Sequence, residues 1–172
     1  MKLARLKAGF ERLLEIIVVG LMIVLTLEVL LGVTFRTLGL SLVWYDEVAS
    51  ILLAWLTYYG SALAALKRAH IGFPGWINGL KPAWRLPAVI LGEAFVFGFF
   101  ILMAWVGWSV LDVLATDSLV SLPFISVNYT QSVIPIGAVL FIIAEALNLP
   151  DILREARGLQ GLRSEAAAEV SH

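Results

Sequence analysis

Cysteine is absent from the 172-residue sequence, and histidine occurs only twice, at His70 and His172. Without cysteine the chain forms no disulfide and no thiolate metal site, and it has no cysteine nucleophile. Two histidines, one of them in a polar tail, are too few for a haem held between histidines. The sequence also lacks Walker, H-E-x-x-H and G-x-S-x-G motifs. We therefore expect a protein that is not an enzyme, without cofactor, metal or nucleic-acid partner.

Charge is also scarce, because 15% of the residues are charged and 60% are hydrophobic. A soluble domain of this size could not hide so much apolar surface, so lipid is the expected solvent. Four apolar runs reach or approach the roughly 20 residues that a helix needs to cross about 30 Å of hydrocarbon. Helices satisfy their own backbone hydrogen bonds there. We predict an all-α integral membrane domain over residues 1–150, with spans at about 13–36, 44–67, 85–112 and 119–149, and a partly disordered tail over 151–172.

The basic residues predict the orientation of these spans. Eleven of the twelve Lys and Arg residues precede the first span, lie between the second and third, or follow the fourth, and only Arg36 lies elsewhere. By the positive-inside rule both termini and the middle connection belong in the cytoplasm. That connection is rich in Gly, Pro and aromatic residues between 70 and 85, so a short interfacial segment is expected. The run Leu13–Phe35 is too long for a signal sequence and is interpreted as a retained span.

Three carboxylates lie within the predicted spans: Glu28, Glu93 and Glu145. A charge at the bilayer centre costs about 2.5–3.5 kcal/mol on insertion scales, so each needs a reason. One interpretation is a proton or cation relay, and the other is a neutral group or a pair with a neighbouring helix or a partner protein. Glu145, close to the inner interface, favours the second. For Glu28, in the outer half of its span, and Glu93, near the middle of its span, partner contact is preferred to ion transport.

The outer ends of the first two spans carry a cluster formed by Arg36, Trp44, Asp46 and Glu47. The short linker brings these helix ends together, so we predict that Arg36 pairs with Asp46 or Glu47. Acids in the first turn also complement the dipole of the second helix. An ordinary interfacial pair without a role beyond topology is the alternative.

The second span ends at Lys67, Arg68 and His70, which form either a stop-transfer cluster at anionic lipid heads or a more specific contact. His70 has no second histidine in reach and is not a metal site. Gly60 and Ala64 form a small-xxx-small pair that allows close helix approach, without indicating the partner.

Two further residues interrupt the apolar pattern. Trp55 falls in mid-span, where we expect it to pack at a helix contact. Pro135 removes one backbone hydrogen bond from the fourth span and can kink it. Asn128, Thr130 and Gln131 precede this proline and can satisfy freed backbone groups or face water.

Taken in order, these residues resemble a known family. Arg36 and Trp44-Tyr45-Asp46-Glu47, followed by Trp55, Gly60, Ala64 and Lys67-Arg68-Ala69-His70-Ile71, resemble the small membrane (Q-type) subunit of tripartite ATP-independent periplasmic (TRAP) transporters. Ser121-Leu122-Pro123 and Pro135-Ile136-Gly137 are similar to the fourth-helix region of that family. The similarity covers essentially Leu13–Leu149, and it depends on order, spacing and topology together.

The resemblance implies a bacterial inner-membrane protein with two partners. In that family a large membrane subunit carries the substrate and sodium sites, and a periplasmic binding protein delivers a carboxylate-bearing solute. The small subunit is a rigid scaffold and part of the docking surface. By position, the outer residues that match the family pattern would be Arg36, Trp44 and Glu47. Asp46, which lies beside them, departs mildly from that pattern. Lys67, Arg68 and His70 would be the inner positions, and membrane lipids would surround the chain.

Two other functions remain open at this point. A small proton-coupled exporter acting as a homodimer also has four spans, and it would use Glu28 or Glu15 as the exchanging group. A membrane-bound redox or hydrolytic enzyme has almost no chemistry available in this sequence, because cysteine is absent and only one histidine is usable.

Overall fold

The computed structural model describes residues 2–69 and 82–158. It contains helices α1 (Lys2–Thr37), α2 (Tyr45–Leu66), α4 (Pro82–Leu114), α5 (Val127–Gln131) and α6 (Val133–Ala156). Four helical segments, with α5 and α6 counted as one, are long and apolar enough to cross a membrane. The predicted all-α fold with four spans is thus confirmed. His70, the predicted interfacial segment and the end of the tail lie outside the described residues.

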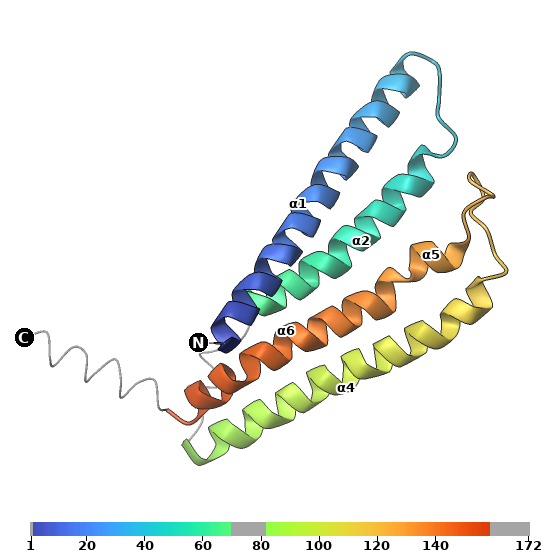
Figure 1. The fold of residues 1–172 in the computed structure, drawn as a ribbon. Coiled ribbons are helices and arrows are strands. Elements are labelled where there is room, and N and C mark those ends of the chain that lie inside the picture. Colours follow the sequence, from blue (N-terminus) through green and yellow to red (C-terminus); the bar gives the residue numbers. More distant parts are fainter. Residues whose placement is uncertain (1, 70–81, 159–172) are drawn as a thin grey trace, which may run out of the picture.

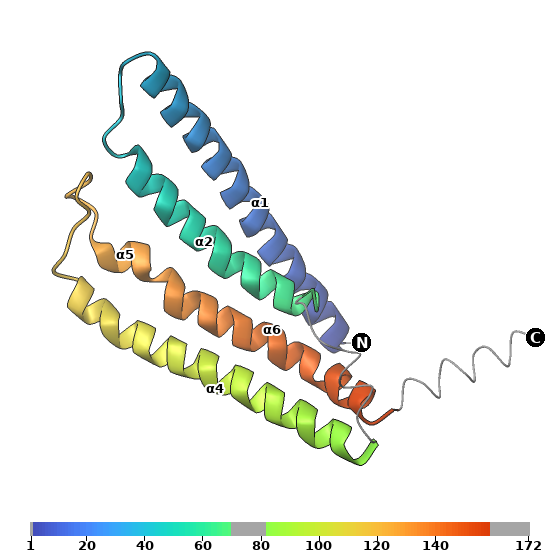
Figure 2. The same cartoon turned by 180° about the vertical axis from the view of Figure 1, so that it is seen from behind.

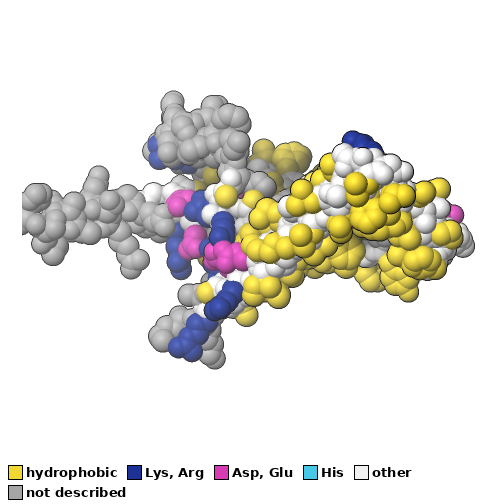
Figure 3. Space-filling model, turned by 90° about the horizontal axis from the view of Figure 1, so that it is seen from above, with side chains coloured by type: hydrophobic (Ala, Val, Ile, Leu, Met, Phe, Trp, Pro, Cys, Tyr) yellow, Lys and Arg dark blue, Asp and Glu magenta, His cyan; other side chains and the backbone are white. Residues whose placement is uncertain are grey.

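The four long helices lie side by side in the order α1, α2, α6, α4 (Figure 1). α2 packs against α1 on one side and α6 on the other, and α6 packs against α4. The helices diverge from one end of the molecule, which the view from behind also shows (Figure 2). The start of α1 and the end of α6 lie at the narrow end, where Lys, Arg, Asp and Glu side chains gather (Figure 3). We call it the polar end, and the opposite end, with residues 38–44 and 115–126, the loop end.

Helix α1 meets α2 along a stripe whose spacing alternates between three and four residues. This spacing keeps one narrow face of a helix against a neighbour. The stripe is buried or half-buried and comprises Leu14, Val18, Leu21, Leu25, Glu28, Gly32 and Phe35. Apolar residues on the remaining surface, such as Ile16, Leu27 and Leu30, are more than half exposed. A helix that is apolar all round is expected in lipid or against another membrane protein.

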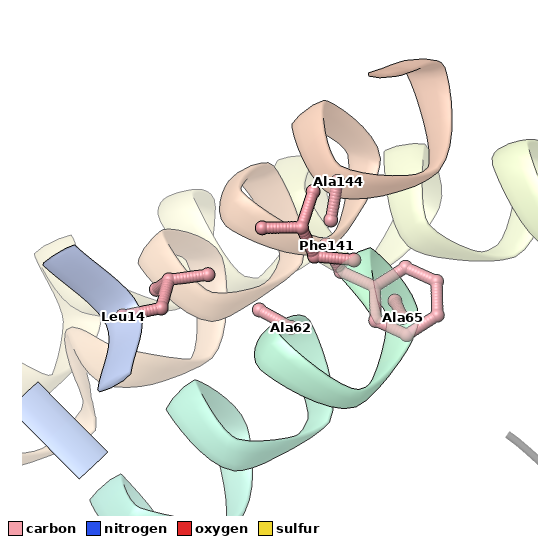
Figure 4. Close-up of a cluster of buried hydrophobic side chains, with 6 residues drawn as sticks. Leu14, Ala62, Ala65, Phe141 and Ala144 are labelled. Carbon is pink, nitrogen blue, oxygen red and sulfur yellow. The ribbon is translucent and has the colours of Figure 1, made fainter. Parts of the chain in front are cut away.

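The main core lies toward the polar end, where three helices meet (Figure 4). Its labelled members are Leu14 of α1, Ala62 and Ala65 of α2, and Phe141 and Ala144 of α6. α4 joins this core through Phe100, whose ring stacks on that of Phe141 with 3.7 Å between centroids. The alanines of α2 allow its neighbours to approach, because small side chains bring helix backbones together in membranes.

Glycines mark close helix contacts: Gly32 against Tyr45, Gly137 against Tyr58, and Gly107 against Pro135. A Cβ atom on Gly137 would lie 2.8 Å from the Cβ of Tyr58, which is closer than unbonded carbon atoms come. At Gly60 an added Cβ would meet nothing within 4 Å. The described helices therefore do not use Gly60 for close approach.

The fourth span is interrupted between α5 and α6. Pro135 has no N–H group and its ring crowds the carbonyl of the residue four positions earlier, which disfavours a continuous helix here. The indole Nε1–H of Trp55 donates a hydrogen bond of 2.9 Å to the carbonyl of Thr130 beside this break. Trp55 therefore lies at a helix contact, as predicted, and satisfies a backbone acceptor as well.

The fourth span also begins later than the sequence indicated, at Val127 and not at Leu119. Residues 115–126 form a compact connection, in which the N–H of Leu119 donates to the carbonyl of Ile125 and that of Val127 to the carbonyl of Asp117. Apolar composition alone extended the predicted span, because the turn residues were hidden within a hydrophobic run. At the other end the helix continues through Pro150 to Ala156.

The glycine contacts give a first prediction. Gly137→Ala should destabilise the chain by about 1–3 kcal/mol, because the new methyl group overpacks the contact of α6 with Tyr58. Thermal unfolding of the purified chain in detergent measures the change. Gly60→Ala is the matched control and should leave the melting temperature unchanged or slightly raised. Equal effects of the two variants would contradict the packing described here.

Candidate functional site

Glu47 connects the two helix pairs at the loop end. It lies in the first turn of α2, and its carboxylate oxygens accept hydrogen bonds from the backbone N–H groups of Val120 (3.0 Å) and Ser121 (2.8 Å). The hydroxyl of Ser121 donates to the carbonyl of Val43 at 3.2 Å. Because a carboxylate accepts backbone N–H groups strongly, this bridge holds the α1–α2 loop against the α4–α5 connection.

The ion pair predicted for Arg36 is not formed in the described part of the chain. Arg36 is exposed and makes no ion pair with Asp46 or Glu47. The reason is that Glu47 directs both oxygens to the connection between α4 and α5. Trp44 immediately precedes α2, and its carbonyl accepts the N–H of Val48. No sequence signal links Glu47 to positions 73 and 74 residues away.

The Glu47 bridge presents an apolar surface at the loop end. Val43 is 83% exposed, Val120 90% and Phe124 82%. We call these three residues the loop-end surface. Large exposed apolar side chains on ordered loops are typical of contacts with a protein or a membrane.

At the polar end, the last turn of α2 is bonded to both of its neighbours. Lys67 pairs with Glu15 and, at 3.5 Å, with Glu11 of α1. Arg68 makes two parallel bonds to Glu155 of α6, at 2.9 and 2.6 Å. The hydrogen bond with Glu15 raises the pKa of Lys67, and that with Glu155 raises the pKa of Arg68. These predicted inner residues thus direct their charge to acids of the chain itself.

Arg68 has an unusual backbone conformation that places its side chain. Its φ is +53°, in the left-handed region. Its N–H donates to the carbonyl of Ala65, and the N–H of Ala69 donates to that of Ala64, which together form a Schellman motif. Glycine is usual at this position, and a side chain costs about 1–2 kcal/mol. In this conformation the side chain makes its bidentate bond to Glu155.

Asn148 is a structural residue that the sequence did not reveal. It is fully buried in α6, and its amide group donates to the carbonyls of Ala65 (2.8 Å) and Leu66 (3.2 Å). Its oxygen accepts a hydrogen bond of 2.6 Å from the amino group of Lys7. A single amide therefore joins α1, α2 and α6. The sequence did carry one signal for this role, because Asn148 is a single asparagine in an apolar run, three residues after Glu145.

Glu93 and Glu145 lie together, on α4 and α6. Their carboxyl groups are close enough to interact, and Arg68 is near enough to interact with both electrostatically. Glu145 therefore lies beside an acid of the neighbouring helix α4. Glu93 lies five residues from the midpoint of α4, on the side of the polar end.

Glu28 differs from the other two acids. It is 8% exposed, and neither carboxyl oxygen has a hydrogen-bond partner among the described residues. Asp46 is close enough to interact with it electrostatically. The structure therefore brings Glu28 near the loop-end acids without giving it a donor.

Open grooves on the layer are apolar. One, of about 570 Å³, lies between α4 and α6 and is lined by residues that include Trp105, Trp108, Val139 and Leu140. Within residues 2–69 and 82–158, no group of three or more His, Asp or Glu side chains is placed to hold a metal ion. The polar groups described above hold helices and loops in place, and the faces between the two ends are apolar.

Four apolar spans, bonded to one another near both ends, define a multi-pass helical membrane protein. Residues 22–155 match the family of the DctQ component of tripartite ATP-independent periplasmic transporters. The chain belongs to this family and is a small membrane subunit of a TRAP transporter, which confirms the resemblance found in the sequence. Comparison with curated proteins gave no match.

Asn148 supports a prediction about stability. Asn148→Leu should lower the free energy of unfolding by about 1–3 kcal/mol, because it leaves two buried carbonyls and Lys7 without their partner. Thermal unfolding in detergent tests this. Asn128→Leu is a matched control, because the side-chain oxygen of Asn128 has no hydrogen-bond partner in the described residues. A loss as large in the control would show that the Asn148 bonds contribute nothing specific.

The Glu47 bridge supports a prediction about dynamics. Glu47→Ala should accelerate hydrogen exchange at the amides of Val120 and Ser121, because it removes their only described acceptor. Exchange followed by mass spectrometry over residues 115–126 measures this. Asp46→Asn, one residue away, is the control and should leave exchange at these amides unchanged. If the amides of Val120 and Ser121 exchanged as slowly in Glu47→Ala as in the wild-type chain, the bridge would be contradicted.

Proposed function

We propose that this chain is the rigid scaffold subunit of a sodium-driven TRAP transporter that takes up carboxylate-containing solutes. It packs beside the large membrane subunit, which carries the substrate and sodium sites. Its loop end faces the periplasm and helps to dock the binding protein. The polar end lies in the cytoplasm, and the membrane is the bacterial inner membrane.

The observation that carries this proposal is the single layer of helices. Among the described residues each long helix has helical neighbours only within the layer, so both broad faces present apolar side chains. Phe95 and Trp105 on α4, for example, are more than 70% exposed. A layer one helix thick encloses no solute path of its own, whereas it offers a long surface to another membrane protein.

The bonds at the two ends support a rigid role. Asn148 and the ion pairs of Lys67 and Arg68 join three helices at the polar end, and Glu47 joins the loops at the other. A frame tied at both ends resists sliding of its helices. A moving transport domain needs such a support to move against.

The distribution of charge supports the orientation. Eleven of the twelve basic residues lie at or beyond the polar end of the spans in the sequence, which favours the cytoplasm for that end. The loop-end surface then faces the side on which a periplasmic binding protein arrives. Its exposed Val43, Val120 and Phe124 favour an apolar contact with that protein.

Family membership favours the scaffold over the proton-coupled exporter. Glu15, one of the two groups that an exporter could use, is engaged with Lys67. The remaining candidate, Glu28, is occluded between helices.

Reconstitution tests the proposal. The tagged chain, co-expressed with the large subunit of the same transporter, should co-purify with that subunit. Proteoliposomes should take up a carboxylate solute only when both subunits, the binding protein and a sodium gradient are present. Uptake by this chain alone, or full uptake by the large subunit without it, would refute the scaffold role.

A further inference from the structure

Glu28 is buried in the face through which α1 contacts α2, between Leu25 and Gly32 of the contact stripe. Every other member of that stripe is apolar or glycine. The carboxyl group is shielded from solvent, and both of its oxygens lack a hydrogen-bond partner in the described part of the chain. Buried polar groups are nearly always hydrogen-bonded, so an exception requires an explanation.

Nearby groups do not supply the missing donor. The hydroxyls of Thr26 and Thr34 flank Glu28 on α1, and each donates to the backbone of its own helix, at Met22 and Leu30. Arg36 lies two turns further along α1 and is exposed. An unpaired carboxyl in an apolar contact is unfavourable in its charged form and in its neutral form.

The charge around Glu28 specifies the kind of donor that fits. Asp46 interacts with Glu28 electrostatically, and both acids lie toward the loop end of the α1–α2 pair. A second negative charge nearby makes a positively charged donor more favourable than a neutral one. Arginine and lysine are the donors that pair with carboxylates inside membranes.

We propose that Glu28 receives a basic side chain, arginine or lysine, from a transmembrane helix of the large membrane subunit. The inference rests on the proposed scaffold function and assigns one residue of its interface. α1 is the edge of the layer of described helices (Figure 1), and Val24 and Leu31, which border the contact stripe, are 50% and 51% exposed, so a partner helix can lie beside the α1–α2 contact.

Glu28 is also placed where the partner can reach it. It lies in the half of α1 nearer the loop end, toward which α1 and α2 diverge. The glutamate side chain has three rotatable bonds, so a change of rotamer moves its carboxyl group toward either broad face of the layer.

Substitution of Glu28 tests the proposal, with measurements on the full chain alone and in complex. Glu28→Leu should raise the melting temperature of the chain alone, because it removes an unpaired buried carboxyl. In the complex it should weaken binding of the large subunit about a hundredfold, because it leaves a basic group buried without its partner. Glu28→Gln, which accepts a hydrogen bond but carries no charge, should show a smaller loss.

Thr26→Val is the matched control, because Thr26 bonds only to its own helix, and it should leave binding unchanged. The inference would be overturned if the Glu28→Leu chain bound the large subunit as tightly as the wild-type chain and its melting temperature rose equally alone and in the complex. That result would leave the scaffold function intact. If the wild-type chain does not bind the large subunit, the proposed function itself fails.

The absence of cysteine permits a direct test of the contact. Glu28→Cys should form a disulfide with one cysteine introduced in place of an arginine or lysine in the membrane helices of the large subunit. Exchange of the two charges at the cross-linked positions should restore binding. If no basic position forms the cross-link, or if charge exchange restores nothing, the proposal is wrong.

Discussion

The structure depends on the way in which the last turn of α2 is satisfied. A helix end leaves carbonyl groups without partners, and in an apolar environment these groups must be bonded from elsewhere. Here a buried amide from α6 bonds two of them, and the local turn at Arg68 bonds others. The same turn aims Lys67 at α1 and Arg68 at α6, so one helix end positions both of its neighbours. The bonds at the polar end therefore converge on the end of α2.

This arrangement explains the shape of the molecule. Small side chains and the main core lie toward the polar end, so the helices are close there and diverge toward the loops. Glu47 limits the divergence by bonding the α4–α5 connection to the start of α2. The result is a flat frame that is held at both ends and is apolar between them. Such a frame suits a subunit that supports another membrane protein.

The acids within the spans have different surroundings, although in the sequence each of them is a glutamate within an apolar run. Glu145 and Glu93 are neighbours from α6 and α4, whereas Glu28 has no partner within the described chain. The difference arises from position in the layer: α4 and α6 pack against each other near Arg68, while Glu28 on α1 lies in an otherwise apolar contact with α2. Among the described acids within the spans, Glu28 is the one for which both buried oxygens lack a hydrogen-bond partner, whereas Glu93 has one such oxygen.

The sequence by itself determined the number of spans, their helical nature and the family, because these depend on local composition, charge and the order of motifs. It also indicated the break at Pro135 and the contact of Trp55, since both follow from the chemistry of one residue. Only the tertiary structure decided that Glu47 bonds Val120 and Ser121 in place of Arg36, that Asn148 completes the end of α2, and that the fourth span begins at Val127. These features join residues far apart in the chain, and hydropathy carries no information about which distant backbone groups a side chain meets in space.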